Sequence, residues 1–86
     1  MRVLLFTSAF CDPCIRTRAV LEQVSEILPG AEVLERDIVR DNVAAELEGI
    51  RSTPTTIVLT DAGGEVFRAE GVPTVNQVLA ALARAL

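Results

Sequence analysis

The start of the chain constrains the fold most, because a short apolar run stands directly before the only two cysteines. The run Val3–Phe6 contains no polar residue, which is typical of a strand covered on both faces. A loop is expected over Thr7–Phe10. Asp12 and Pro13 suit the first turn of a helix, because proline needs no hydrogen-bond donor there and a carboxylate favours the positive end. The chain therefore begins with a buried strand that leads into a helix.

Apolar residues at helical spacing extend this first helix until Pro29 and Gly30, which end it. The expected buried stripe consists of Ile15, Val20, Leu21, Val24, Ile27 and Leu28. A second strand is expected over 32–39, and its charged residues at 35–37 favour an edge position over a central one. Strand, helix and strand in succession imply a parallel, right-handed crossover.

A short helix is expected next, capped by Asp41 or Asn42 and ending at Gly49. Val43 and Leu47 lie one turn apart in it. No internal repeat or interdomain linker is visible in the chain.

Strands are then expected over 55–60 and 65–69, on either side of a hairpin turn at 61–64. Thr74 and Gln77 form a capping box at the start of a last helix. Its expected buried stripe consists of Val75, Val78, Leu79, Leu82 and Leu86.

The resulting order, β-α-β-α-β-β-α, predicts an α/β fold with one central four-stranded mixed sheet and helices on both faces. The 86 residues are expected to form a single domain, 1–86. The longest unbroken apolar stretch, Val78–Ala83, is far shorter than the ~20 residues of a membrane-spanning helix.

Charge argues against nucleic acid and anionic membranes as partners. The net charge is −4, and all eight basic residues are arginines spread along the chain, whereas a nucleic-acid-binding protein usually gathers its cations on one face. Met1–Phe6 is too short for the apolar part of a signal peptide, and Phe10 stands where a lipoprotein signal needs a small residue before its cysteine. We therefore expect a cytoplasmic protein, and a monomer is the default.

The chain contains no histidine, which removes the commonest general base and metal ligand. Ser-His-Asp catalysis, Cys-His catalysis and zinc sites that need imidazole are excluded. Two cysteines cannot complete a four-thiolate metal site within one chain. Any chemistry must therefore use thiols, carboxylates, hydroxyls or a borrowed cofactor. We expect no metal and no bound cofactor of the chain's own.

Cys11-Asp12-Pro13-Cys14 has the spacing at which two sulfur atoms come within bridging distance around one helical turn. Cys11 is expected at the helix N-terminus, where free N–H groups and the helix dipole stabilise a thiolate. Cys14 is expected one turn deeper, where burial keeps it protonated until a mixed disulfide forms beside it. This arrangement predicts an attacking thiol and a resolving thiol.

Three other interpretations of the cysteine pair were weighed. A structural disulfide that closes so short a loop stabilises little. Half of a metal site shared by two chains is possible, without any feature in its favour. Two reduced core cysteines fit poorly, because Asp12-Pro13 is an unsuitable core segment. The sequence therefore favours redox chemistry.

A second motif precedes the third expected strand. Pro54, between Thr53 and Thr55, opens the apolar run Thr56–Leu59, although a proline is unusual in a strand that should be central. A cis peptide bond before Pro54 would suit this position.

Together these motifs resemble the thioredoxin/glutaredoxin superfamily over essentially the whole chain. The residues that resemble it are Phe10–Cys14 after a strand, Gly49–Thr55, the hairpin Gly63–Val66, and Gly71 before the last helix. The resemblance implies a compact, glutaredoxin-sized thioredoxin-like fold. It implies Cys11 as the nucleophile, Cys14 as the resolving thiol, and a cis Thr53–Pro54 bond beside the disulfide. Main-chain groups of Thr53 would then pair with an extended substrate segment.

The resemblance also implies the partners: disulfide-containing protein substrates, and a flavoprotein similar to thioredoxin reductase as electron donor. Further substrate-binding residues would be Phe10, Asp12, Pro13 and Gly71, with Phe10 covering the sulfur where thioredoxins carry tryptophan. The Cys11–Cys14 disulfide would be the redox centre. A carboxylate at Asp12 disfavours the neighbouring thiolate, which predicts a more reducing couple than glycine there would give.

Two departures from the family pattern bear on whether the chain is more similar to thioredoxins or to glutaredoxins. Thioredoxins bury an aspartate six residues before the first cysteine, where this chain has Leu5, and the usual lysine partner of that aspartate falls near Glu35. Glutaredoxins bind glutathione through a basic residue and a Gly-Gly pair followed by an acidic helix cap. Here Gly63-Gly64 fits a hairpin turn, and Arg16, Arg18 and Arg51 were interpreted as solvated surface residues rather than contacts to a tripeptide.

Reduction of protein disulfides by a dithiol mechanism is therefore the predicted function. A glutaredoxin-type reductase that uses glutathione or another small thiol is the alternative. A non-catalytic redox switch or adaptor is the alternative from another class.

Overall fold

Seven elements follow one another in the order expected from the sequence. The computed structural model describes all 86 residues. The strands are β1 (Arg2–Thr7), β2 (Glu32–Asp37), β3 (Thr55–Leu59) and β4 (Glu65–Glu70). The helices are α1 (Asp12–Ile27), α2 (Asn42–Leu47) and α3 (Val75–Arg84). The order β-α-β-α-β-β-α is confirmed.

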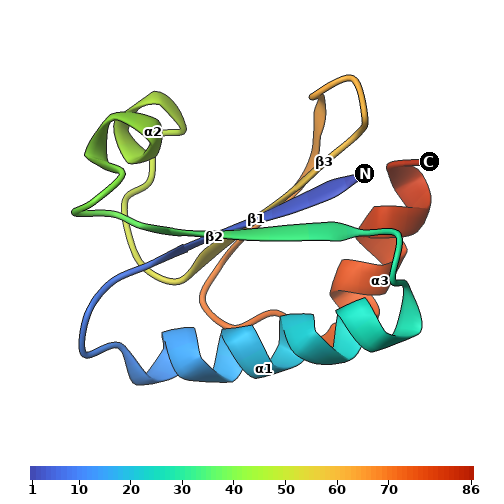
Figure 1. Cartoon of the computed structure of the whole chain (residues 1–86), viewed down its shortest axis with the longest axis horizontal. Coiled ribbons are helices and arrows are strands. Elements are labelled where there is room, and N and C mark those ends of the chain that lie inside the picture. The colour runs from blue at the N-terminus through green and yellow to red at the C-terminus, as the bar shows by residue number, and fades with distance from the viewer.

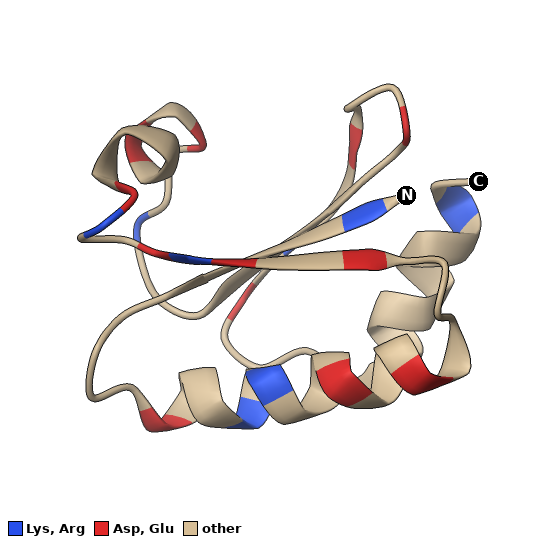
Figure 2. Ribbon diagram, in the orientation of Figure 1, with Lys and Arg blue, Asp and Glu red and all other residues tan.

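The four strands form one mixed sheet in the order β2-β1-β3-β4. β1 runs parallel to β2, and both β1–β3 and β3–β4 are antiparallel. Helices α1 and α3 lie on one side of the sheet and α2 lies on the other (Figure 1). The prediction of a mixed sheet with helices on both faces is therefore confirmed, as is the edge position of the charged strand β2 (Figure 2).

The core has a larger and a smaller part, one on each side of the sheet. The larger part, under α1 and α3, includes Val3, Leu5, Leu21, Val24, Val58, Val78, Ala81 and Leu82. The smaller part, under α2, consists of Phe6, Ala45 and Ile57. Alternation along β1 and β3 sends neighbouring residues to opposite faces, which is why a continuous apolar run was correctly interpreted as a strand buried on both sides.

The buried stripe of α1 differs from the expected one. Ile15 and Ile27 are exposed, and the buried residues are Cys14, Thr17, Leu21 and Val24. Thr17 can be buried because its hydroxyl donates to the carbonyl of Pro13 at 2.9 Å. The prediction was wrong at Ile15 and Ile27 because it was based on hydropathy alone. Hydropathy does not indicate that a threonine can be buried when its hydroxyl is hydrogen-bonded within the helix.

In the short helix α2, Ala45 is the buried residue, and Val43 and Leu47 are exposed. At the end of the chain the prediction that Leu86 is buried was wrong: Leu86 is exposed, and Ala85 is buried instead. Leu86 follows the end of α3 at Arg84, so it does not continue the buried stripe of that helix.

β2 ends at Asp37, two residues earlier than expected. The Asp37 carboxylate accepts hydrogen bonds from the N–H groups of Val39 and Arg40, at 2.8 Å and 3.2 Å. This local turn takes the chain away from the sheet edge. The capping box of α3 is present as predicted, with Thr74 and Gln77 each bonded to the other's N–H group. None of the three helices is long and apolar enough to span a bilayer.

Candidate functional site

Cys11 occupies the N-cap position of α1. Its backbone is extended, with φ −116° and ψ 96°, and its carbonyl accepts hydrogen bonds from the N–H groups of Cys14 and Ile15. The amide N–H of Cys14 also donates to Cys11 Sγ at 3.2 Å. Pro13 lies in the first turn, where its missing N–H leaves no carbonyl unpaired. The helix start therefore directs a hydrogen-bond donor and the positive end of its dipole at the first sulfur atom.

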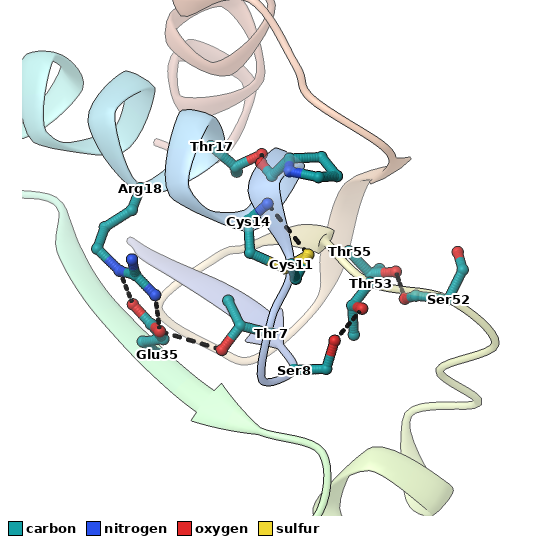
Figure 3. Close-up of a disulfide and its surroundings, with 11 residues drawn as sticks. Thr7, Ser8, Cys11, Cys14, Thr17, Arg18, Glu35, Ser52, Thr53 and Thr55 are labelled. Atoms are coloured by element: carbon teal, nitrogen blue, oxygen red, sulfur yellow. Dashed lines mark hydrogen bonds and ion pairs between the residues drawn. A yellow bond between two sulfur atoms is a disulfide. The ribbon is translucent and has the colours of Figure 1, made fainter.

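Cys11 and Cys14 form a disulfide, with their Cα atoms 5.2 Å apart (Figure 3). The two cysteines differ in exposure: Cys11 is half-buried, whereas only 2% of Cys14 is exposed. An incoming molecule can therefore reach the first sulfur and not the second. This difference follows from the helix, because Cys14 lies on the face of α1 that packs on the sheet.

The loop before β3 stands next to the disulfide loop in space. The peptide bond between Thr53 and Pro54 is cis. The hydroxyl groups of Ser8 and Thr53 are 2.6 Å apart and share a hydrogen bond, which ties the loop before α1 to the loop before β3 (Figure 3). The N–H of Gly71 donates to the carbonyl of Pro54 at 2.9 Å. Thr53, Pro54 and Gly71 therefore lie next to one another.

Glu70 holds the same loop from the end of β4. Its carboxylate accepts hydrogen bonds from Arg51 Nη2 at 2.8 Å and from Ser52 Oγ at 3.0 Å. These two bonds, the one to Arg51 first, lower the pKa of Glu70. The Thr55 hydroxyl donates to the carbonyl of Ser52 at 2.7 Å and closes the turn. The loop is thus fixed at both of its ends.

Phe10 differs from the expectation that it covers the sulfur. Its side chain is fully exposed and packs against no other residue. Its φ of +56° lies in the left-handed region, which is uncommon for a bulky residue. This backbone turn directs the ring outward. Asp12 is exposed and Pro13 half-buried.

A third group of polar residues lies on the β2 side of the disulfide. Arg18 binds Glu35 with two hydrogen bonds, of 2.8 Å and 2.6 Å, and the Thr7 hydroxyl donates to the same carboxylate at 3.0 Å (Figure 3). The Arg18 guanidinium is the main cause that lowers the pKa of Glu35, partial burial opposes it, and Thr7 adds to it. Leu5, which pairs with Glu35 in the sheet, is buried.

Arg18 and Arg51 lie at the surface, as expected from the sequence, and each also makes an ion pair. Arg18 pairs with Glu35, and Arg51 pairs with Glu70. Their partners lie 17 and 19 residues away in the chain, so no local spacing could have revealed them. Ser8 was missed for the same reason, since its partner Thr53 is 45 residues away.

Chemically, this arrangement offers one accessible sulfur, one buried sulfur and a fixed loop beside them. No three potential metal ligands among the cysteines and carboxylates converge anywhere in the structure.

No protein-family model matches the chain, and no curated protein matches it in sequence. Several solved structures are similar to it. Chloroplastic thioredoxin z is 25% identical over 98% of this chain and 76% of that chain, with a TM-score of 0.84. Thioredoxin of Fasciola hepatica is 24% identical over 99% of this chain and 80% of that chain, also with a TM-score of 0.84. Thioredoxin 1 of the thermophilic eubacterium Thermosipho africanus is 15% identical over 98% and 92%, with a TM-score of 0.82.

The resemblance noted in the sequence is thus confirmed: the chain has the thioredoxin fold, with a disulfide-bonded Cys-x-x-Cys at the start of α1. A redox-active disulfide on this fold supports thiol–disulfide oxidoreductase chemistry in general.

Proposed function

We propose that this protein reduces the disulfides of other proteins by a dithiol mechanism, with Cys11 as nucleophile and Cys14 as resolving thiol. The observation that carries the proposal is the difference between the two sulfur atoms. Cys11 is accessible and accepts a hydrogen bond from the Cys14 amide, whereas Cys14 is buried. A donor directed at Cys11 stabilises its thiolate, which is the form that attacks a disulfide.

The reaction proceeds in two exchanges. The Cys11 thiolate attacks one sulfur of the substrate disulfide; a mixed disulfide forms, and the other substrate sulfur leaves as a thiolate that takes up a proton. Cys14 then loses its proton and attacks Cys11 Sγ, which releases the second substrate thiol. The substrate gains two electrons and two protons, and the protein is left with the Cys11–Cys14 disulfide seen in the structure.

Thr53 supplies a place for the substrate chain. Neither its N–H nor its carbonyl takes part in a main-chain hydrogen bond. Both groups are free to pair with an extended segment, as in other cases where a peptide adds to an exposed strand. Phe10 and Val72, both exposed, offer apolar contacts to the same segment. We therefore assign Thr53, Pro54, Phe10 and Gly71, with Asp12 and Pro13 at the helix start, to substrate binding.

The glutaredoxin-type alternative is less well supported. Binding of glutathione needs cations for its carboxylates. Of the three candidate arginines, Arg18 and Arg51 are paired with Glu35 and Glu70, which leaves Arg16 without an ion-pair partner. Gly63 and Gly64 form the turn between β3 and β4, where both of their N–H groups bond to Thr60. They are not next to the disulfide loop.

The proposal also covers the electron donor, the oligomeric state and the cellular compartment. The oxidised protein has to be reduced again by two electrons, for which a flavoprotein similar to thioredoxin reductase is the donor that we propose. We propose further that the protein works as a monomer in the cytoplasm, where thiols are kept reduced.

The test compares three forms of the protein in two assays: reduction of insulin disulfides with dithiothreitol as donor, and reduction of a glutathione mixed disulfide by glutathione. The wild type is expected to accelerate the first reaction, and both Cys11→Ser and Cys14→Ser are expected to lower its rate to the uncatalysed level. If Cys14→Ser keeps its turnover with glutathione, the glutaredoxin-type function is favoured instead. If the wild type and Cys11→Ser are equal in both assays, the protein is a switch or adaptor.

A further inference from the structure

One buried side-chain polar atom has no hydrogen-bond partner, the hydroxyl oxygen of Thr56. The residue is completely buried in the central strand β3. Leaving a buried hydroxyl unpaired is unfavourable by about 1–3 kcal/mol, and such groups are rare enough in native structures to need an explanation. The oxidised protein therefore contains an uncommitted donor in its core.

The sheet register gives the position of this hydroxyl. Thr56 pairs with Leu5 on one side and Ala69 on the other, and Leu5 pairs in turn with Glu35. Paired residues point to the same face of a sheet. The row also shares its face with Val58, two residues along β3, which packs in the core under α1 and α3. Thr56 therefore faces α1.

The part of α1 above this row is its beginning. The ion pair between Arg18 and Glu35 fixes the helix over the end of the row (Figure 3). The buried residues of α1 in its first two turns are Cys14 and Thr17. Cys14, on the buried face of α1, and Thr56, on the sheet face that α1 covers, therefore both face the layer between this helix and the sheet.

The other polar groups of this layer are already committed. The Thr17 hydroxyl donates to the Pro13 carbonyl, and the Thr7 hydroxyl donates to Glu35. Leu5 has no polar group to offer. Thr56 is left as the one hydroxyl in this region that is free to donate.

We propose that the Thr56 hydroxyl donates a hydrogen bond to the sulfur of Cys14 in the reduced protein. Reduction of the disulfide takes up two electrons and two protons and turns the Cys14 sulfur into a thiol, which accepts such a bond weakly. When Cys14 loses its proton to attack Cys11, the bond becomes stronger, because a thiolate is charged. The Thr56 hydroxyl therefore has no partner in the oxidised protein and gains one when the disulfide is reduced.

The hydroxyl favours the reduced state twice, by leaving the oxidised core unsatisfied and by bonding to the reduced one. Replacing it with a methyl group of the same shape removes both effects. In Thr56→Val, the equilibrium constant for reduction of the disulfide by glutathione is expected to fall about tenfold, equivalent to a potential about 30 mV more negative. The oxidised variant is expected to melt at or above the wild-type temperature.

The experiment equilibrates each protein in glutathione buffers, traps the thiols by alkylation and counts them by intact mass. Thr56→Ser keeps the hydroxyl and is expected to stay within twofold of the wild-type equilibrium constant, although it loses a buried methyl group. Thr55→Val is the matched control. Thr55 directly precedes Thr56 in β3 and is also buried, but its hydroxyl already donates to the carbonyl of Ser52. It is expected to lower the melting temperature without shifting the redox equilibrium.

Three results would overturn the inference: a Thr56→Val equilibrium within twofold of wild type, a Thr56→Ser equilibrium shifted as far as that of Thr56→Val, or an oxidised Thr56→Val protein that melts well below wild type. The inference rests on Cys11 and Cys14 being the reactive pair of the proposed function. The equilibrium needs only glutathione, so a protein that fails to reduce other proteins would still give a clear answer.

Discussion

Cys14→Ser, incubated in reduced form with an excess of an oxidised protein substrate, is expected to accumulate as a covalent adduct in most of its molecules. The free Cys11 thiolate attacks the substrate disulfide, and without the resolving thiol the mixed disulfide cannot be released from within the chain. Intact mass under non-reducing conditions measures the adduct directly, and dithiothreitol should return both proteins to their original masses.

Cys11→Ser is the control for this trap. Its remaining thiol belongs to Cys14, of which only 2% is exposed, so a folded protein cannot bring it against a substrate disulfide. Little or no adduct is expected over the same time. An adduct on Cys11→Ser as abundant as on Cys14→Ser would contradict the assignment of the two roles, and so would the absence of any adduct on Cys14→Ser.

Phe6→Ala is expected to lower the free energy of unfolding by about 3–5 kcal/mol. Phe6 is 1% exposed and is the largest residue of the small core under α2, where the other buried residues are Ala45 and Ile57. Removing its ring leaves a cavity in a core of only three buried residues. Because proteins of this kind have unfolding free energies of about 5–15 kcal/mol, the loss is a large share of the total. Urea denaturation followed by circular dichroism measures it.

Phe10→Ala is the matched substitution at an exposed phenylalanine. Its side chain packs against nothing, so the free energy of unfolding is expected to change by no more than about 0.5 kcal/mol. The same variant is expected to raise the KM for a protein disulfide, because the ring is available to a bound substrate. Equal destabilisation by Phe6→Ala and Phe10→Ala would contradict the packing described for the two rings.

The sequence predicted the fold well because its signals are local and consistent. An apolar run without alternation, a proline in a helix's first turn, a Gly-Gly turn and a capping box each specify one element, and their order leaves few topologies. The errors lie in which helix residues are buried. Ile15 is exposed and Thr17 is buried, which shows that hydropathy alone does not decide which face of a helix packs on the sheet.

The site was predictable to the extent that it is local. Cys11 and Cys14 lie within one turn, and the motif around Pro54 is short. The polar contacts that hold the site, between Ser8 and Thr53 and between Arg18 and Glu35, join distant segments. Their partners are fixed only by the sheet register, which a single sequence does not reveal. The unpaired hydroxyl of Thr56 is of the same kind, because only the folded core shows which donors have no acceptor.

The central claim is that Cys11 and Cys14 form a reducing dithiol couple, and a redox titration of this couple tests it most directly. Protein equilibrated over a range of dithiol buffers is alkylated, and its free thiols are counted by intact mass. The account predicts a single two-electron transition near or below about −270 mV, the potential of a protein-disulfide reductase of the thioredoxin kind. A midpoint above about −200 mV, or a protein in which no intramolecular disulfide forms, would contradict it.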